Sequence, residues 1–575
     1  MEVRVKMRRI WCACSLLSCC ALLPHGAFSQ SDTCGRARAV LQAPAGNRPV
    51  EIHPAGETVL PNGRLITPLG KHVKVAPHPY GLALSPEGKT LVTANSGTSP
   101  FSFSIITDLE TDQPRVVQVP PTGHATADDD DDELESVFLG VAIAPDNRTL
   151  YLAEGDNGRV GIFDLVTRQR LDSISLDGTF QGKTFKNSLT GELKLSPDGR
   201  RLYVLDLAHF RMAVLDRAAK KIVASIGVGR MPFGLAVAPD GKRVYVSNVG
   251  MFEYSLIPGY DSKDPRDTGL DFPPYGFPSK EAAQGTSVNG KRIPGLGDPN
   301  VPESNSVFVI DVSDAANPRV TAKIRTGIPI GAGSVGGSSP GAVVAGRQKV
   351  FVSNAAQDSI SIINAQTEKI EKTIVLEPAE SVRGLRGVLP FGMALSPDEK
   401  RLYVACAGIN AIAVIDARAD RVLGYFPAAW FPARLEIRSD GRALYVASAK
   451  GLGSGPNGGP DFQPGPEGTY IGEITKGVVS IVPLPDANAL QQATIRVLQN
   501  NGFGPNSVGN VSDNRAHRAS PRNLPPPPSP AAHTLPTLRH LVFIVKENRT
   551  FDEVFGDIPD INGDPVNAEP SLARW

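Results

Sequence analysis

Short runs of alternating apolar and polar residues recur along the chain, and most of them come in pairs. In Met231–Asn248, the segment Gly-Leu-Ala-Val is followed by the turn Pro-Asp-Gly and by a second run, where Val244 and Val246 share one face and Tyr245 takes the other. Proline presets φ and glycine accepts positive φ, so Pro239–Gly241 favours a tight turn. The pair predicts a β-hairpin, which is barely stable alone and must pack against other copies.

Seven copies of this hairpin are present, and most are followed by another β-rich run that ends in Asp. Each unit therefore supplies up to four short strands, and seven such units can close a ring. Two long insertions, Phe252–Ser304 and Gly451–Lys476, interrupt the repeat and are expected to lie on one face of the ring. The seven copies begin at Gly81, Gly140, Gly191, Gly234, Gly341, Phe391 and Arg434.

The pattern predicts an all-β fold, a seven-bladed β-propeller spanning residues 73–485. Its APDGKRVYVSN units resemble those of YVTN-type (YncE-like) seven-bladed propellers, and the resemblance covers Val73 to Val482. It indicates the fold and says little about function, because a propeller is a platform for many activities. The preceding leader, residues 30–72, is rich in Pro and Gly and could contribute a strand that closes the ring.

The first 29 residues predict a secretory signal peptide. Four basic residues precede the apolar run Ile10–Leu23, and Ala27–Ser29 is an acceptable cleavage site. The run is too short to anchor the chain across a bilayer, so we expect no transmembrane anchor. A lipid anchor at Cys19, in an imperfect lipobox, is the less favoured alternative. The protein is therefore expected to be periplasmic or secreted.

Composition excludes several classes of partner. The chain has 59 basic and 59 acidic residues, so no nucleic-acid partner is expected. After signal removal only Cys34 and Cys406 remain, and no Cys-x-x-Cys-His motif for covalent haem is present. A disulfide between these two cysteines is one interpretation. We favour the other, in which Cys406 is a small, buried, apolar residue of a strand.

No catalytic set stands out in the repeats. The acidic run Ala127–Glu135 is interpreted as a solvated loop, because it lacks the spacing and the turn glycine of a calcium loop. The recurrent asparagines at strand ends, Asn95, Asn248 and Asn354, are interpreted as turn residues that bond their own backbone. Scattered histidines are expected to be ordinary hydrogen-bonded residues: His53, His72, His78, His124 and His209.

The pattern changes after Pro485. Residues 486–502 predict a helix with Asp486 as N-cap, and residues 503–537 form a Pro-rich linker. In residues 538–575, a continuous apolar strand ends just before Glu547 and Asn548, the position where α/β sheets place their ligands. These two side chains suit a hard divalent cation. Equally, Glu547 could only cap the following turn, and the residues alone do not decide between the two.

The segment HLVFIVKENRTFDEVFGD resembles the opening motif of the phosphoesterase branch of the alkaline phosphatase superfamily. The order of propeller and motif resembles the bifunctional YncE/alkaline-phosphatase-like family. The resemblance implies that, where the phosphoesterase domain is complete, Glu547 and Asn548 bind a divalent metal that assists the hydrolysis of phosphate esters. The family's Ser/Thr nucleophile and further metal ligands are absent before Trp575. We therefore expect an incomplete α/β phosphoesterase fragment and a truncated chain without hydrolase activity of its own.

Two other functions are weighed against this one. A stand-alone binding or scaffold propeller would contact a protein or a cell-envelope ligand through its blade loops. A propeller lactonase would use carboxylates and a metal in the central channel. The lactonase is the least favoured, because no set of residues in the sequence supports it.

Overall fold

The computed structural model describes two compact units of the chain, Met1–Asn510 and Val511–Trp575, which are treated separately. The second unit is described only in two paired strands, β35 (Asp560–Ile561) and β36 (Asp564–Pro565). The first is described over residues 43–53, 56–97, 101–120, 134–255, 257–261, 263–269, 278–334, 336–453 and 475–503.

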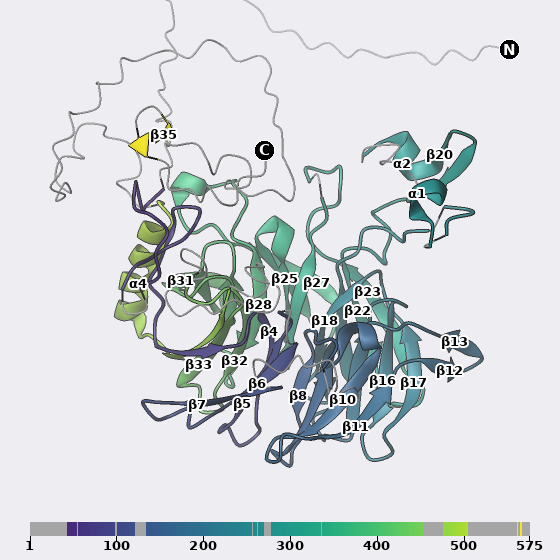
Figure 1. Cartoon of the computed structure of the whole chain (residues 1–575), viewed down its shortest axis with the longest axis horizontal. Helices are drawn as coiled ribbons and strands as arrows, with labels where there is room; N and C mark the ends of the chain where they lie inside the picture. The colour runs from purple at the N-terminus through teal and green to yellow at the C-terminus, as the bar shows by residue number, and fades with distance from the viewer. Residues whose placement is uncertain are drawn as a thin grey trace, which may run out of the picture. The chain divides into compact units, whose positions relative to one another are not determined.

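Seven four-stranded antiparallel sheets make up the first unit (Figure 1). Blade 1 contains β4 (Pro79–Leu84), β5 (Leu91–Asn95), β6 (Ser102–Thr107) and β7 (Arg115–Val119). Blade 2 contains β8 (Val141–Ile143), β9 (Thr149–Ala153), β10 (Arg159–Asp164) and β11 (Arg170–Ser175). Blade 3 contains β14 (Thr190–Leu195), β15 (Arg201–Asp206), β16 (Arg211–Asp216) and β17 (Lys221–Gly227). Blade 4 contains β18 (Pro232–Val237), β19 (Arg243–Asn248), β22 (Ser306–Asp311) and β23 (Arg319–Arg325).

The remaining blades follow the same plan. Blade 5 contains β24 (Pro340–Ala345), β25 (Lys349–Asn354), β26 (Ser359–Asn364) and β27 (Lys369–Val375). Blade 6 contains β28 (Pro390–Leu395), β29 (Arg401–Cys406), β30 (Ala411–Asp416) and β31 (Arg421–Pro427). Blade 7 contains β32 (Pro432–Ile437), β33 (Ala443–Ser448), β34 (Gly477–Pro483) and β3 (Lys71–Val75). The seven predicted hairpins are the first two strands of the seven blades, so the predicted propeller is confirmed.

The first strands of the blades line a central channel and contact one another in the order β4, β8, β14, β18, β24, β28, β32 and back to β4. The ring is closed by β3, which pairs with β34 from the other end of the propeller, with Val73 opposite Val479. A closing strand from the leader, residues 30–72, was expected, and β3 begins at Lys71, at the end of that segment, and continues to Val75. Closure removes the open edges that an incomplete ring would expose.

Close packing between neighbouring blades explains the glycine that begins the repeat. A Cβ on Gly234 would collide with the carbonyl oxygen of Gly341 on the next first strand, and Gly392 meets Ala433 in the same way. Along β19 the side chains alternate between the two faces of the blade, as the sequence predicts. Val244 and Val246 pack on the blade 3 side, and Tyr245 packs on the blade 5 side. The core is therefore a series of apolar layers between the blades.

Polar side chains before the third strands of blades 5 and 6 tie each of these two blades to the one that follows it. The two carboxylate oxygens of Asp358 accept hydrogen bonds from the backbone N–H groups of Leu389 and Gly387, both at 2.7 Å. Asn410 Oδ1 accepts one from the N–H of Phe431 at 3.0 Å. These bonds fix the segments that lead into the first strands, and so they fix one mouth of the channel.

Helix α4 (Ala487–Asn500) confirms the helix predicted after the repeats. The Asp486 side chain accepts a hydrogen bond from the N–H of Ala489, as an N-cap should. The helix packs on β31, where the Thr494 hydroxyl accepts from the N–H of Tyr425 at 2.9 Å and donates to its carbonyl at 3.1 Å. It thereby satisfies part of the exposed edge of blade 6.

The long insertion of blade 4 stands out from the blades near β22 and β23 (Figure 1). It contains α1 (Pro265–Thr268), α2 (Lys280–Gln284), β20 (Gly285–Val288) and β21 (Lys291–Pro294). Among the described residues, no helix is long and apolar enough to cross a membrane. The remaining short elements are β1 (Thr58–Val59), β2 (Leu65–Ile66), β12 (Gly178–Phe180), β13 (Lys183–Phe185), η1 (Gly155–Asn157), η2 (Ala355–Gln357) and η3 (Glu380–Val382).

Candidate functional site

A cavity of about 230 Å³ lies in the central channel, and the seven blades all contribute to its wall. Its apolar lining includes Leu82, Leu139, Leu235, Met393 and Leu435. Four charged side chains also line it, and they come from only two blades. Blade 3 contributes Glu192 and Lys194, and blade 7 contributes Arg434 and Glu436. These four residues are called the channel quartet below.

An ion pair between Arg434 and Glu192 links blades 7 and 3, which are three blades apart in the ring. Arg434 also donates from Nε to the carbonyl oxygen of Tyr80 at 2.9 Å, and Glu192 is only 2% exposed. Lys194 Nζ lies 3.6 Å from Glu192 Oε1 and keeps 35% of its side chain exposed. The pair therefore bars the channel, while solvent still reaches the cavity beside it.

Glu436 is the member of the channel quartet that lacks a partner. Within the described part of the chain its side chain makes no hydrogen bond or ion pair, although it is only partly exposed and lines the cavity. Burial raises the pKa of its carboxyl group, and the nearby Glu192 carboxylate adds to this, while Lys194 and Arg434 act in the opposite direction. A carboxyl group with a raised pKa in a cleft is a typical feature of a functional site.

Aromatic rings cluster at the mouth of the channel where the first strands begin. Tyr80, Phe233 and Phe391 each occupy the second position of a first strand, and Phe431 directly precedes β32. The Tyr80 ring lies 6.3 Å from the rings of Phe391 and Phe431, and Phe233 lies 6.0 Å from Phe391. These are ordinary aromatic packing distances. The cavity includes later positions of the strands and therefore faces the opposite mouth, which carries the short turns.

Glu436 should make stability depend on pH. Its raised pKa means that the native state holds the proton more tightly than the unfolded chain. The free energy of unfolding should therefore fall as pH rises from about 4.5, the ordinary value, through the native pKa. We expect Glu436→Gln to be more stable than the wild type at pH 8, because the amide carries no charge that burial disfavours.

At pH 4 the two proteins should unfold alike, because Glu436 is then protonated in both states. Urea unfolding at pH 4, 6 and 8 measures the difference. A Glu436→Gln variant that is less stable than the wild type at pH 8 would contradict the expected sign.

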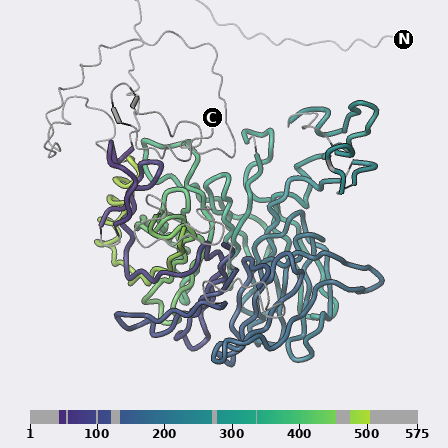
Figure 2. Tube along the Cα trace, in the orientation of Figure 1, coloured from purple at the N-terminus to yellow at the C-terminus, as the bar shows by residue number. Residues whose placement is uncertain are grey.

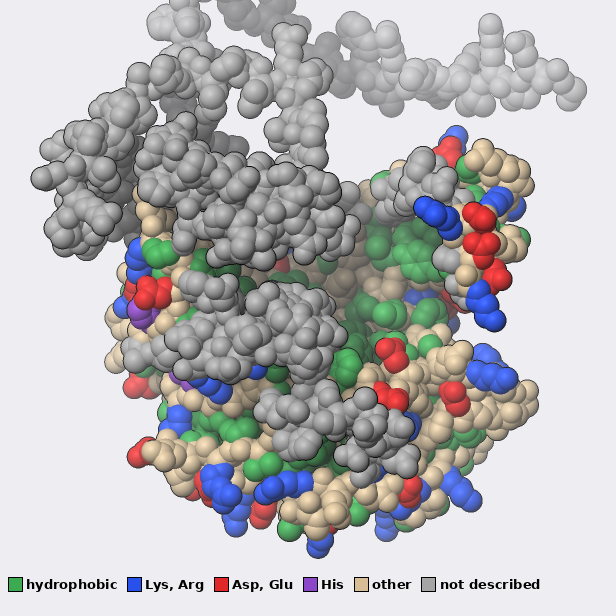
Figure 3. Space-filling view, in the orientation of Figure 1, with side chains coloured by type: hydrophobic (Ala, Val, Ile, Leu, Met, Phe, Trp, Pro, Cys, Tyr) green, Lys and Arg blue, Asp and Glu red, His purple; other side chains and the backbone are tan. Residues whose placement is uncertain are grey.

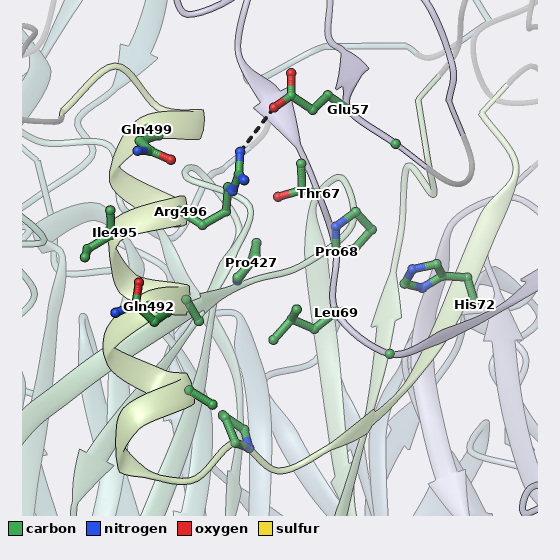
Figure 4. Close-up of a pocket in the computed structure, with 15 residues that line it drawn as sticks. Glu57, Thr67, Pro68, Leu69, His72, Pro427, Gln492, Ile495, Arg496 and Gln499 are labelled. Carbon is green, nitrogen blue, oxygen red and sulfur yellow. Dashed lines mark hydrogen bonds and ion pairs between the residues drawn. The ribbon is translucent and has the colours of Figure 1, made fainter.

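A second, larger cavity of about 960 Å³ lies between α4 and the leader (Figure 4). The leader runs beside α4 in the trace as well (Figure 2). Arg496 on the helix pairs with Glu57 at 3.2 Å, and Glu57 also pairs with Arg48. His72 is hydrogen-bonded to Ser480. Its charged or ionisable lining groups thus have partners, so this cavity is the weaker candidate for a ligand.

The histidines behave as expected where the structure describes them, because each has a local partner and they do not converge. His53 pairs with Glu51, His72 and His78 bond Ser480 and Thr475, and His209 bonds Asp206. No cluster of three metal-ligating side chains occurs among the described residues. His124, most of the acidic run 127–135, and the predicted metal ligands Glu547 and Asn548 lie outside the described residues.

The prediction for the strand-end asparagines is wrong. Asn95 and Asn354 are the last residues of β5 and β25, are fully buried, and bond serine hydroxyls of the adjacent third strand. They therefore join strands and do not form turns. Cys406 occupies the equivalent position in blade 6, where it is fully buried and burial raises the pKa of its thiol to about 12. This supports the interpretation as a small apolar residue, and Cys34 lies outside the described residues.

The channel quartet was missed, although the repeat contains a signal for it. The Gly and Ala of Gly-Leu-Ala-Val are Gly234 and Ala236 in blade 4. Register against the second strand places Glu192 and Arg434 at the Gly position, and Lys194 and Glu436 at the Ala position. The other copies carry small or apolar residues at both positions. A comparison of the copies with one another would have revealed complementary charges in two of them.

Comparisons with known proteins leave the function open. Neither the scan against protein-family models nor the search of curated proteins found a match. A solved structure of hydrazine synthase from Kuenenia stuttgartiensis aligns with a TM-score of 0.41 and 18% identity, covering 66% of this chain and 95% of that chain. Likeness at that level carries no argument about activity. The class, a seven-bladed β-propeller, rests on the strands and their pairing.

Proposed function

We propose that this protein is an exported binding propeller whose ligand occupies the channel cavity. The observation that carries the proposal is Glu436, an unpartnered carboxyl group in a cavity to which solvent has access. A largely buried charge without a partner lowers stability, and five of the seven copies carry alanine or valine at this position, so a glutamate there favours a role in binding. Export is supported by the basic and apolar pattern of residues 1–29.

Ligand-observed NMR with mixtures of small polar fragments tests this proposal on the full chain. We expect fragments to bind the wild type and to be lost in Ala342→Phe, which fills the cavity from β24. The matched control is Ala316→Phe, which places the same side chain at an exposed position outside the channel. Thermal melts check that both variants fold. If no fragment distinguishes the two variants, the cavity is not the binding site.

A second candidate function is supported by the motif at residues 540–557. Its likeness to the opening of phosphoesterase domains favours divalent-metal binding by Glu547 and Asn548, next to a propeller that binds a substrate or partner. Calorimetric titration of the full chain with Mn²⁺ tests it. We expect Glu547→Gln to weaken Mn²⁺ binding at least tenfold and Glu553→Gln, a nearby carboxylate outside the matched pair, to leave it unchanged. Equal effects of the two changes would contradict this assignment.

A further inference from the structure

Charge arrangement in the channel quartet indicates the class of ligand, and this inference rests on the proposed binding function. With all four side chains ionised, two carboxylates and two cations sum to zero. Glu192 is fully engaged, because Arg434 and Lys194 both lie against it. Glu436 has no donor among the described residues. The described side chains around Glu436 therefore give its carboxyl group no hydrogen bond.

Lys194, on the other side of the cavity, has donors left for an anionic group of a ligand. Lys194 has three N–H donors and a single long contact, 3.6 Å, to Glu192, with about a third of its side chain exposed. A ligand that brought only a cation would satisfy Glu436 and give the site an excess positive charge. A ligand that brought only an anion could use Lys194 and would leave Glu436 unpaired beside a further negative charge. A ligand with both groups satisfies both side chains and keeps the site neutral.

Size and wall chemistry narrow the ligand further. Cavities for drug-sized molecules span about 300–1,000 Å³, so one of about 230 Å³ takes a smaller metabolite. Polar and apolar surface both face the cavity, because Leu82, Leu139, Leu235 and Met393 are themselves nearly buried between the blades. The wall therefore suits a small ligand that carries polar groups.

We propose that the channel cavity binds a small zwitterion with an ammonium group and a carboxylate group, that is, a small amino acid. The ammonium group donates to Glu436, and the carboxylate accepts from Lys194. The Arg434–Glu192 pair and the aromatic mouth close the channel behind the ligand, so the ligand enters and leaves by the mouth with the short turns.

Calorimetric titration of the full chain with three matched probes tests the class of ligand: L-leucine, 3-methylbutylamine and 4-methylpentanoate. The last two carry the same alkyl group with only the ammonium or only the carboxylate. We expect L-leucine to bind at least tenfold more tightly than either. Glu436→Gln and Lys194→Met should each weaken L-leucine binding at least tenfold, while Glu371→Gln, on the exposed outer strand of blade 5, should not change it.

The possible failures are distinguishable. If 3-methylbutylamine binds as tightly as L-leucine, or if Lys194→Met has no effect, the zwitterion assignment is wrong while binding in the cavity stands. If polar fragments bind the wild type and fail to bind Ala342→Phe, but L-leucine does not bind, the ligand belongs to another class, such as a neutral polyol. If neither L-leucine nor any fragment depends on the cavity, both proposals are wrong.

Discussion

Replacing Asp206 with alanine is expected to lower the free energy of unfolding by about 3–5 kcal/mol, because it leaves a buried guanidinium without its counter-ion. Arg211 is 2% exposed and pairs through Nε with Asp206 Oδ2 at 2.8 Å. Its charge centre lies 3.5 Å from the centroid of the Phe185 ring, so little water can replace the lost carboxylate. Urea unfolding of the full chain measures the effect.

A double variant separates lost pairing from lost packing. Asp206→Leu combined with Arg211→Met should recover most of the stability, since replacing both members of a buried pair by apolar residues is often neutral. The control is Asp172→Ala, which breaks an exposed ion pair with Lys220 and should cost about 0–1 kcal/mol. A loss below 1 kcal/mol for Asp206→Ala would mean that Arg211 is not buried as described.

Replacing Val73 with aspartate is expected to lower the free energy of unfolding by about 3 kcal/mol or more, because it places a charge in the layer that closes the ring. Val73 is 6% exposed in β3 and packs with Tyr445 and Val479 of blade 7. Since β3 is the strand that joins the two ends of the propeller, its loss would expose the edge of β34 from Gly477 to Ile481.

The matched control is Val223→Asp, the same change at an exposed position of β17, an outer strand of blade 3. We expect an effect within about 0.5 kcal/mol there. Thermal melts and size-exclusion chromatography follow both variants, because an open edge also favours association between chains. Equal stability of the two variants would show that β3 does not close the ring.

Much of the fold could be predicted from the sequence because the signal is repeated. One hairpin such as Met231–Asn248 is ambiguous alone, but seven of them must bury their apolar faces against each other, and a ring is the arrangement that does so. The helix after Asp486 could be predicted for another reason: its N-cap and its apolar spacing are local features of the sequence. The sequence has equal numbers of basic and acidic residues, and the two kinds of side chain are interspersed on the face seen in Figure 3.

The candidate site could not be predicted in the same way, because its residues meet only in the closed ring. Glu192 and Arg434 are separated by 242 positions in sequence, and nothing local indicates that blades 3 and 7 face each other across the channel. The asparagine prediction failed for a related reason. Asn95 has the composition of a turn residue, yet its partners, Ser102 and Ser104, belong to the neighbouring strand. In both cases the partner of the side chain lies on another strand, which the local sequence does not identify.

The central claim is that the channel cavity beside the Arg434–Glu192 pair binds a small zwitterion between Glu436 and Lys194. A crystal structure of the full-length protein grown with L-leucine tests it most directly. We predict ligand density between the Glu436 carboxylate and the Lys194 ammonium group, with the Arg434–Glu192 pair intact behind it. A cavity that holds only water while Glu436 pairs directly with Lys194 would contradict the account.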